Sequence, residues 1–241
     1  MPGLEKLQKL QAMGLGPVWQ RRDRPVAEAE PEPEPEPEHV SAQANVQADI
    51  ASMDWDQLHL AITACRRCRL CEHRTQALPG SGDRHAAWLL LSAAPDRDED
   101  QQGQALAGTA GSLLGNMLTA VELERDSQTF LTHLVKCRPL GADGHDRPAA
   151  ADEIAACLPY LQRQIALIQP ELLLALGQTA ATALLAPQEN PSLAELRGRV
   201  HRYGSLPVVV THHPQDLLRS PLDKAASWRD LCVAKNGGDG H

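Results

Sequence analysis

The stretch Leu172-Leu173-Leu174-Ala175-Leu176-Gly177 decides the fold class of this chain. Five consecutive apolar residues are typical of a strand that is buried on both faces, and the glycine after them opens a helix. Comparable apolar runs lie at residues 87–91, 129–135 and 208–210, and helical patterns lie at residues 113–118 and 152–168. This alternation predicts an α/β fold with three α/β/α layers around a central parallel sheet.

The 241-residue chain carries a net charge of −8, which is distributed unevenly. Residues 26–56 carry −9, whereas residues 1–25 carry +3 and residues 57–241 carry −2. The folded part is therefore near neutral, which predicts no bulk attraction to DNA, although arginine clusters can still contact phosphates. No secretory signal opens the chain, and no apolar run approaches the roughly 20 residues of a membrane span. These features predict a cytoplasmic protein without membrane contact.

A low-complexity segment, Pro31–Glu38, alternates proline with glutamate. Proline cannot join a helix or a ladder and the carboxylates repel one another, so this segment is an extended, solvated spacer. The predicted organisation is a partner-binding peptide at 1–25, a disordered acidic linker rich in proline and glutamate at 26–51, a globular domain at 52–235 and a flexible tail at 236–241.

The N-terminal peptide combines a short apolar series with an aromatic residue and paired arginines. A helix this short is marginal alone and cannot bury its own apolar stripe, whereas tryptophan and arginine anchor interfaces. We therefore predict that it folds on a partner; the alternative is a frayed terminus with scattered leucines. The predicted partner-binding residues are Leu7, Leu10, Met13, Leu15, Trp19, Arg21 and Arg22.

Four cysteines, Cys65, Cys68, Cys137 and Cys157, form a close pair followed by two distant thiols, the spacing with which a protein binds a metal cluster. Thiolates are soft ligands that select zinc or an iron–sulfur centre. Cys71 extends the pair to CxxCxxC, and spacing alone does not choose among the three thiols. The sixth cysteine, Cys232, lies in an amphipathic stretch and is predicted to be a core residue.

Further motifs occur in a fixed order along the domain: Cys65-Arg66-Arg67-Cys68, Gly108-Thr109-Ala110-Gly111, Val135-Lys136-Cys137-Arg138-Pro139, Cys157-Leu158-Pro159 and His213-Pro214. Together they resemble the iron–sulfur (family 4-like) uracil-DNA glycosylases over about residues 60–232. The resemblance implies the glycosylase fold and a [4Fe–4S] cluster held by Cys65, Cys68, Cys137 and Cys157. Cys71 is then a spare thiol, and zinc is the minor alternative.

Three base-handling positions depart from this family. The resemblance places Ala93 on a glutamate, Leu106 on the phenylalanine that stacks on the base, and His133 on the asparagine that reads the uracil edge. Leucine has no π-face, and imidazole cannot present the paired donor and acceptor of an amide. These departures predict a catalytically degenerate pocket.

Three polar residues of the implied pocket remain, namely Glu99, Asp100 and His213. His213 is the candidate electrophile toward a uracil anion, or a relic. His133 is a candidate relic or a satisfied buried histidine, and Glu99 is the third relic candidate.

Residues 4–22 resemble the psi subunits of bacterial DNA polymerase III holoenzymes in the order of their leucines, glutamines, glycine, tryptophan and arginines. With the altered pocket, this resemblance implies a non-catalytic psi-like subunit in DNA replication. Its N-terminal peptide would bind clamp-loader subunits, and its globular domain would bind the chi subunit, which in turn binds single-stranded DNA-binding protein. Direct contact with DNA is possible but not required. The alternative is an iron–sulfur uracil-DNA glycosylase of base-excision repair, in which His213 is catalytic and phosphates are contacted by Arg66, Arg67, Arg69, Lys136 and Arg138. The other role open to these cations is to offset the negative charge of the thiolate cluster without touching DNA.

Overall fold

The computed structural model describes residues 49–185 and 191–238. The chain separates into two units, residues 1–40 and 41–241, and every described residue belongs to the second. The predicted partner-binding peptide lies outside the described residues, and so does the predicted linker up to residue 48. Their boundaries stay predictions.

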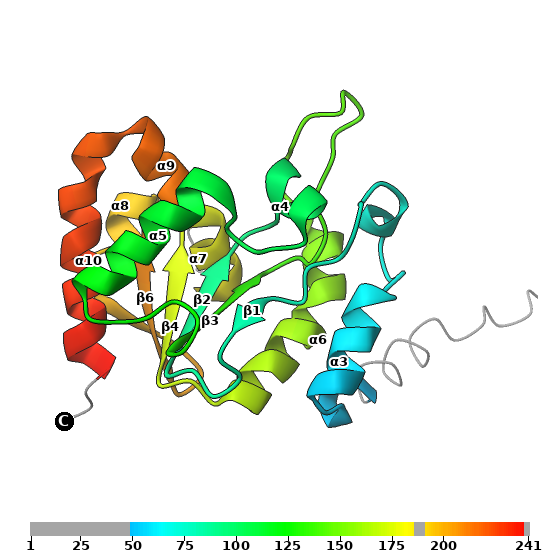
Figure 1. Cartoon of the computed structure of the whole chain (residues 1–241), viewed down its shortest axis with the longest axis horizontal. Coiled ribbons are helices and arrows are strands. Elements are labelled where there is room, and N and C mark those ends of the chain that lie inside the picture. The colour runs from blue at the N-terminus through cyan, green and yellow to red at the C-terminus, as the bar shows by residue number, and fades with distance from the viewer. Residues whose placement is uncertain (1–48, 186–190, 239–241) are drawn as a thin grey trace, which may run out of the picture. The chain divides into compact units, whose positions relative to one another are not determined.

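In the described part, six strands form one sheet in the order β1-β3-β2-β4-β6-β5 (Figure 1). The four central strands are parallel and confirm the predicted core of the sheet: β2 (Trp88–Ser92), β3 (Thr129–His133), β4 (Leu172–Leu176) and β6 (Leu206–Thr211). The two edge strands, β1 (Ser81–Gly82) and β5 (Val200–Tyr203), are antiparallel to their neighbours. Sequence patterning missed both edges, because β1 has only two residues and β5 alternates between exposed and half-buried positions.

Helices connect and cover the strands. The helices that begin and end within the described residues are α3 (Trp55–Thr63), α4 (Arg97–Gln102), α5 (Gly108–Ala120), α6 (Ala151–Ile168), α7 (Gln178–Leu185), α8 (Leu193–Leu196), α9 (Pro214–Arg219) and α10 (Lys224–Gly238), with short 3₁₀ turns at η1 (Arg69–Glu72) and η2 (Pro221–Asp223). Residues 49–52 are helical as well. None of these helices is long and apolar enough to cross a membrane.

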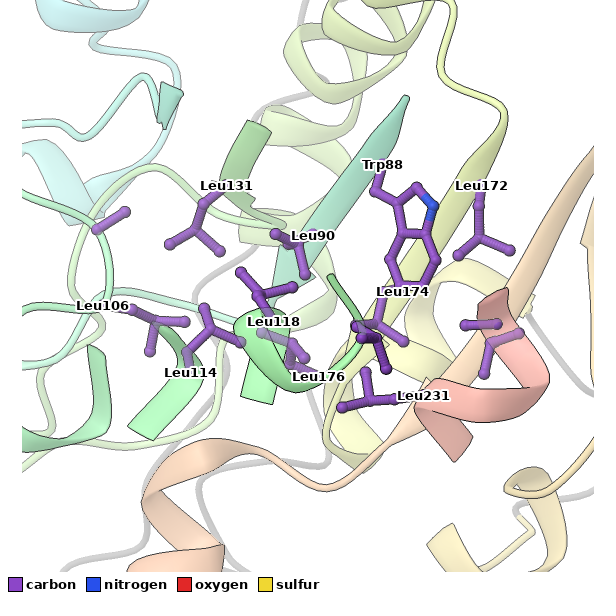
Figure 2. Packing of buried hydrophobic residues seen from close by; sticks show 14 of the residues in the cluster. Trp88, Leu90, Leu106, Leu114, Leu118, Leu131, Leu172, Leu174, Leu176 and Leu231 are labelled. Carbon is purple, nitrogen blue, oxygen red and sulfur yellow. The ribbon is translucent and has the colours of Figure 1, made fainter. Parts of the chain in front are cut away.

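The buried residues alternate between the two faces of the sheet, as the period of two along a strand requires. Leu90 and Leu174 point toward α5 and α10, where they pack with Leu114 and Leu231 (Figure 2). Their neighbours along the strands, such as Leu89, pack on the opposite face against α6 and α7. The predicted three-layer α/β/α architecture is therefore confirmed, and Figure 1 shows the two helical layers on either side of the strands.

The parallel strands bring their carboxyl ends to one edge of the sheet, where α/β proteins place their ligands. The loops that leave β2, β3, β4 and β6 meet there. Gly177 makes this convergence tight: it follows β4 with a φ of +86°, and a Cβ at this position would lie 3.3 Å from the Cβ of His213 after β6. Glycine is favoured because it reaches positive φ without strain.

Candidate active site and thiol cluster

A pocket of about 440 Å³ opens at the carboxyl edge of the sheet. Its size lies within the range of small-molecule and nucleobase sites, roughly 300–1,000 Å³. The walls come from four segments that follow four parallel strands: residues 92–99, residues 146–149, residues 176–179 and residues 213–219. Sequence positions more than a hundred residues apart therefore line one cavity.

His213 lies in the pocket wall with a defined tautomer. It is the N-cap of α9, and its Nδ1 accepts a hydrogen bond of 3.2 Å from the backbone N–H of Gln215. The ring proton is therefore assigned to Nε2, which lies 3.2 Å from Ser92 Oγ. Burial lowers the pKa of His213, so the ring is neutral at neutral pH. The site thus contains a neutral imidazole with its N–H donor directed at the pocket-lining Ser92.

Glu99, which belongs to the pocket wall, forms a buried pair with His133. His133 Nε2 lies 3.0 Å from Glu99 Oε1, and the two side chains are 0% and 4% exposed. Burial opposes ionisation of Glu99, but the charge and the hydrogen bond of His133 outweigh it and hold the pKa of this carboxyl below its ordinary value. Glu99 also accepts from the backbone N–H groups of Asp96, at 2.8 Å, and Leu106. With three donors on one carboxylate, Glu99 braces the loop between α4 and α5.

The other predicted pocket positions have different outcomes. Ala93 lines the pocket, but Leu106 does not belong to its walls; it is 2% exposed and packs in the core layer of α5 (Figure 2). Asp100 accepts from the backbone N–H groups of Thr75 and Gln76 at 3.0 and 3.3 Å. Asp100 therefore anchors the segment after the first cysteines and does not contact the pocket.

The structure brings the four predicted cluster cysteines together beside α3 and α6. Cys137 and Cys157 are each 3% exposed in an apolar group with Tyr160, against which the half-buried Cys65 and Cys68 pack. Burial raises the pKa of Cys68 and Cys157, and that of Cys137 to about 12, and the neighbouring thiols add to each shift. Such mutual effects require the four thiols to lie within electrostatic reach of one another.

Two observations bear on whether these thiols could hold a metal group. Among the described residues, no three histidine, cysteine or acidic side chains are placed closely enough to hold a metal ion. Arg67 lies 5.7 Å from the centre of the Tyr160 ring, and its buried Nη1 has no hydrogen-bond partner in the described part of the chain. The charge of Arg67 lowers the pKa of Cys157 against the larger effect of burial, which places the guanidinium near the thiols. A sulfide-rich cluster would supply the missing acceptor.

The sequence analysis did not identify one residue of the pocket and predicted a wrong role for another residue. Ser92 was not singled out, although it is the first polar residue after the apolar run of β2. Under the glycosylase alternative Lys136 was predicted to contact phosphates, but it is 1% exposed, and its Nζ donates at 2.7 Å to Thr132 Oγ1, His133 O and Gln164 Oε1. Burial lowers the pKa of Lys136 to about 7, and a buried Nζ with three partners cannot reach a DNA backbone, so that role is wrong for Lys136.

Residues 79–234 match the sequence model of the uracil DNA glycosylase superfamily, and the chain belongs to this superfamily. Within it, the chain is similar to proteins named type-4 uracil-DNA glycosylase. The protein from Pyrobaculum aerophilum is 33% identical over 192 residues, which cover 77% of this chain and 95% of the relative. That from Sulfurisphaera tokodaii is 37% identical over 167 residues (66% and 74%), and that from Archaeoglobus fulgidus is 33% identical over 172 residues (69% and 84%).

These comparisons correct two predictions. The prediction of a non-catalytic psi-like subunit that bridges the clamp loader to the chi subunit is wrong, and so is the prediction that the chain is not an enzyme, because the relatives are glycosylases over most of the domain. The psi resemblance covered residues 4–22 only, and such short similarity arises readily by chance. The partner contacts predicted for that peptide lie outside the described residues and stay untested.

The same comparisons do not support a degenerate pocket. The prediction of a degenerate pocket treated the substitutions at Ala93, Leu106 and His133 as three independent losses of function. It did not consider the contacts that the pocket residues make with one another. Glu99 and His133 are paired in the structure, and His213 keeps a donor at the pocket.

Proposed function

We propose that this chain excises uracil from DNA by hydrolysing the bond between the base and the sugar. The observation that carries the proposal is the neutral His213, whose Nε2–H lies 3.2 Å from Ser92 in the wall of a pocket large enough for one base. The type-4 uracil-DNA glycosylase relatives support the same activity.

The proposed chemistry follows from this geometry. A base inside a duplex is out of reach of the pocket, so the nucleotide must be flipped out or presented in a single strand. When the C1′–N1 bond breaks, its electron pair leaves with the base, and negative charge develops on the base oxygens. The Nε2–H of His213 can turn from Ser92 Oγ to such an oxygen and stabilise this charge without giving up its proton. A water molecule adds to C1′, and its proton completes the balance on the released uracil.

A neutral donor suits this role better than a charged one. An imidazolium would also attract the anion, but burial disfavours the charged ring, as the lowered pKa of His213 indicates. The donor is already placed before substrate arrives, so little reorganisation is needed during bond breaking.

We further propose that Cys65, Cys68, Cys137 and Cys157 hold a [4Fe–4S] cluster. The four thiols come from the segment after α3, the segment after β3, and α6. When bound, such a cluster would crosslink these three segments through iron–thiolate bonds. Zinc is the alternative, and measurement of iron, zinc and acid-labile sulfide in anaerobically purified chain separates the two.

The test of uracil excision uses the full chain with its cluster and oligonucleotides that carry one deoxyuridine, single-stranded and duplex. Abasic sites are counted by alkaline cleavage under single-turnover conditions. His213→Ala should lower the rate by about 10²–10³-fold, the usual cost of removing one such donor. His212→Ala is the matched control, because this neighbouring half-buried imidazole hydrogen-bonds Ser227 and should leave the rate nearly unchanged. Absence of abasic sites with iron-loaded wild type, or equal rates for His213→Ala and wild type, would overturn the proposal.

A further inference from the structure

Arg74 joins two of the segments that carry the cluster cysteines. Its Nη1 donates to Cys137 Sγ at 2.9 Å, and its Nη2 donates to the carbonyl oxygens of Thr63 at 3.0 Å and Cys65 at 2.9 Å. Cys137 follows β3, whereas Thr63 and Cys65 lie at the end of α3. One side chain therefore bridges the segment of Thr63 and Cys65 to Cys137, which lies 63 positions after Arg74 in the sequence.

The chemistry of this bridge requires a guanidinium. Arginine presents five N–H donors in a rigid plane, so one group can serve three acceptors in different directions. A lysine ammonium has three donors on one atom and lacks this spread. Hydrogen bonds to a charged acceptor are also stronger than neutral ones, which favours the contact with Cys137 once its sulfur is a thiolate.

The backbone around Arg74 is itself held in place. The next two residues, Thr75 and Gln76, donate their backbone N–H groups to the buried carboxylate of Asp100. Gln76 Nε2 also donates to the backbone oxygen of Asp100 at 3.1 Å. Asp100 belongs to α4, so the guanidinium is placed from a point outside the cysteine segments. Such external support is what fixes the orientation of groups around metal ligands.

We propose that Arg74 is a positioning residue for the cluster, with two effects. It holds the segments of Cys65 and Cys137 together before the metal binds, and its N–H bond to the sulfur of Cys137 raises the reduction potential and slows cluster loss. The second effect follows because a donor to a ligand sulfur stabilises the more negative, reduced state. This inference rests on the proposed cluster and is independent of uracil excision.

Three variants and a control separate position from charge. Arg74→Ala removes both the N–H donors of the bridge and the positive charge. Arg74→Lys keeps the charge, and Arg74→Gln keeps an amide donor without charge. Arg69→Ala is the matched control, because Arg69 is an exposed arginine of the same cysteine-rich segment. Each chain is purified anaerobically, and iron content, midpoint potential by spectroelectrochemical titration and the rate of iron loss to a chelator are measured.

We expect Arg74→Ala to lose iron at least tenfold faster than wild type and to have a more negative midpoint potential. Arg74→Lys should retain part of the potential but lose iron nearly as fast as Arg74→Ala, because its ammonium cannot bridge all three acceptors. Arg69→Ala should match wild type in both measurements. Wild-type potential and wild-type iron loss in Arg74→Ala would overturn the proposal.

A second measurement applies if a variant does not take up iron. In the metal-free chains, amide hydrogen exchange of residues 63–68 should be at least tenfold faster in Arg74→Ala than in wild type, whereas Arg69→Ala should leave it unchanged. Equal exchange would refute the bridging role even without a cluster. If wild type itself contains no iron, the cluster proposal fails. The exchange rates then test the bridging role of Arg74 alone. None of these outcomes depends on whether the chain excises uracil.

Discussion

The imidazole of His133, on the last residue of β3, meets the carboxylate of Glu99 in α4 at 3.0 Å, and neither side chain is more than 4% exposed. Glu99 belongs to the pocket wall. Glu99 also caps α4 by accepting from the backbone of Asp96, so one carboxylate links a strand end, a helix start and the loop that leads to α5.

Glu99→Ala should lower the free energy of unfolding by about 3–5 kcal/mol, because removing one partner of a buried pair leaves the other without compensation. Urea denaturation of the two chains measures this difference. Asp98→Ala provides the control, since Asp98 is an exposed residue of the same helical turn and should cost no more than about 1 kcal/mol. Equal losses in both variants would mean that the pair does not stabilise the loop.

The stability that depends on His213 should fall in weak acid. Burial lowers the folded-state pKa of this ring below its ordinary value of about 6.5. The charges of Asp216 and Glu99 oppose this shift, and those of His133 and Arg219 add to it. As the pH falls through about 6.5, the unfolded chain therefore takes up a proton before the folded chain does, and stability is lost until the pH reaches the folded-state pKa.

Comparison of wild type with His213→Ala isolates this effect. The difference in unfolding free energy between the two chains should be constant above pH 7 and should shift in favour of the variant as the pH falls to 5. Urea denaturation at intervals of half a pH unit measures it. Glu99 does not interfere with this measurement. Its pKa is lowered in the folded chain, so the stability that its carboxylate contributes is lost only at more acidic pH. A difference that is independent of pH would show that the ring titrates alike in both states.

Two glycines of α5 should respond to alanine in opposite directions. A Cβ on Gly111 would lie 1.8 Å from the backbone oxygen of Leu106, and the backbone there cannot move freely because Arg125 binds the same oxygen at 2.9 Å. Gly111→Ala should therefore destabilise the chain by about 1–3 kcal/mol or more. A Cβ on Gly115 meets nothing within 4 Å, so Gly115→Ala should stabilise it by up to about 1 kcal/mol. Denaturant midpoints compare the pair, and a stable Gly111→Ala chain would contradict the close approach.

The choice of cluster ligands predicts a difference between two thiols. Cys137→Ser should abolish iron binding and destabilise the domain by several kcal/mol, because cluster binding is coupled to folding. Cys71→Ser should retain wild-type iron content, since Cys71 is the spare thiol of the proposed set. Iron and acid-labile sulfide per chain, with thermal unfolding of the same samples, check both. Loss of iron in Cys71→Ser would show that the first cysteines are wrongly assigned.

The core of the sheet was predictable because its signal is local. Each central strand is a short apolar run, and the predicted run at 172–176 agrees with β4 at both ends. The helix predicted at 152–168 agrees with α6 to within one residue. The edge strands carried no such run, since an edge buries less surface and tolerates polar residues.

The candidate site was predictable only in part. The cysteine spacing predicted a metal site, and the family resemblance implied the four thiols that the structure brings together; the motif at His213 indicated a donor at a strand end. The position of Leu106 was not predictable: it has a φ of +45° and packs in the core rather than in the pocket wall. The hydrophobic pattern of a sequence does not predict the backbone conformation of a single residue.

By itself, the sequence determined the layers of this protein, because burial on two faces is a property of consecutive residues; its cysteine spacing predicted a metal site without choosing all four ligands. Only the tertiary structure decided which polar groups meet. Glu99 finds His133 across 34 positions and Arg74 finds Cys137 across 63, because the fold brings these polar groups within hydrogen-bond distance. Such pairings depend on three-dimensional distance, which a one-dimensional pattern does not contain.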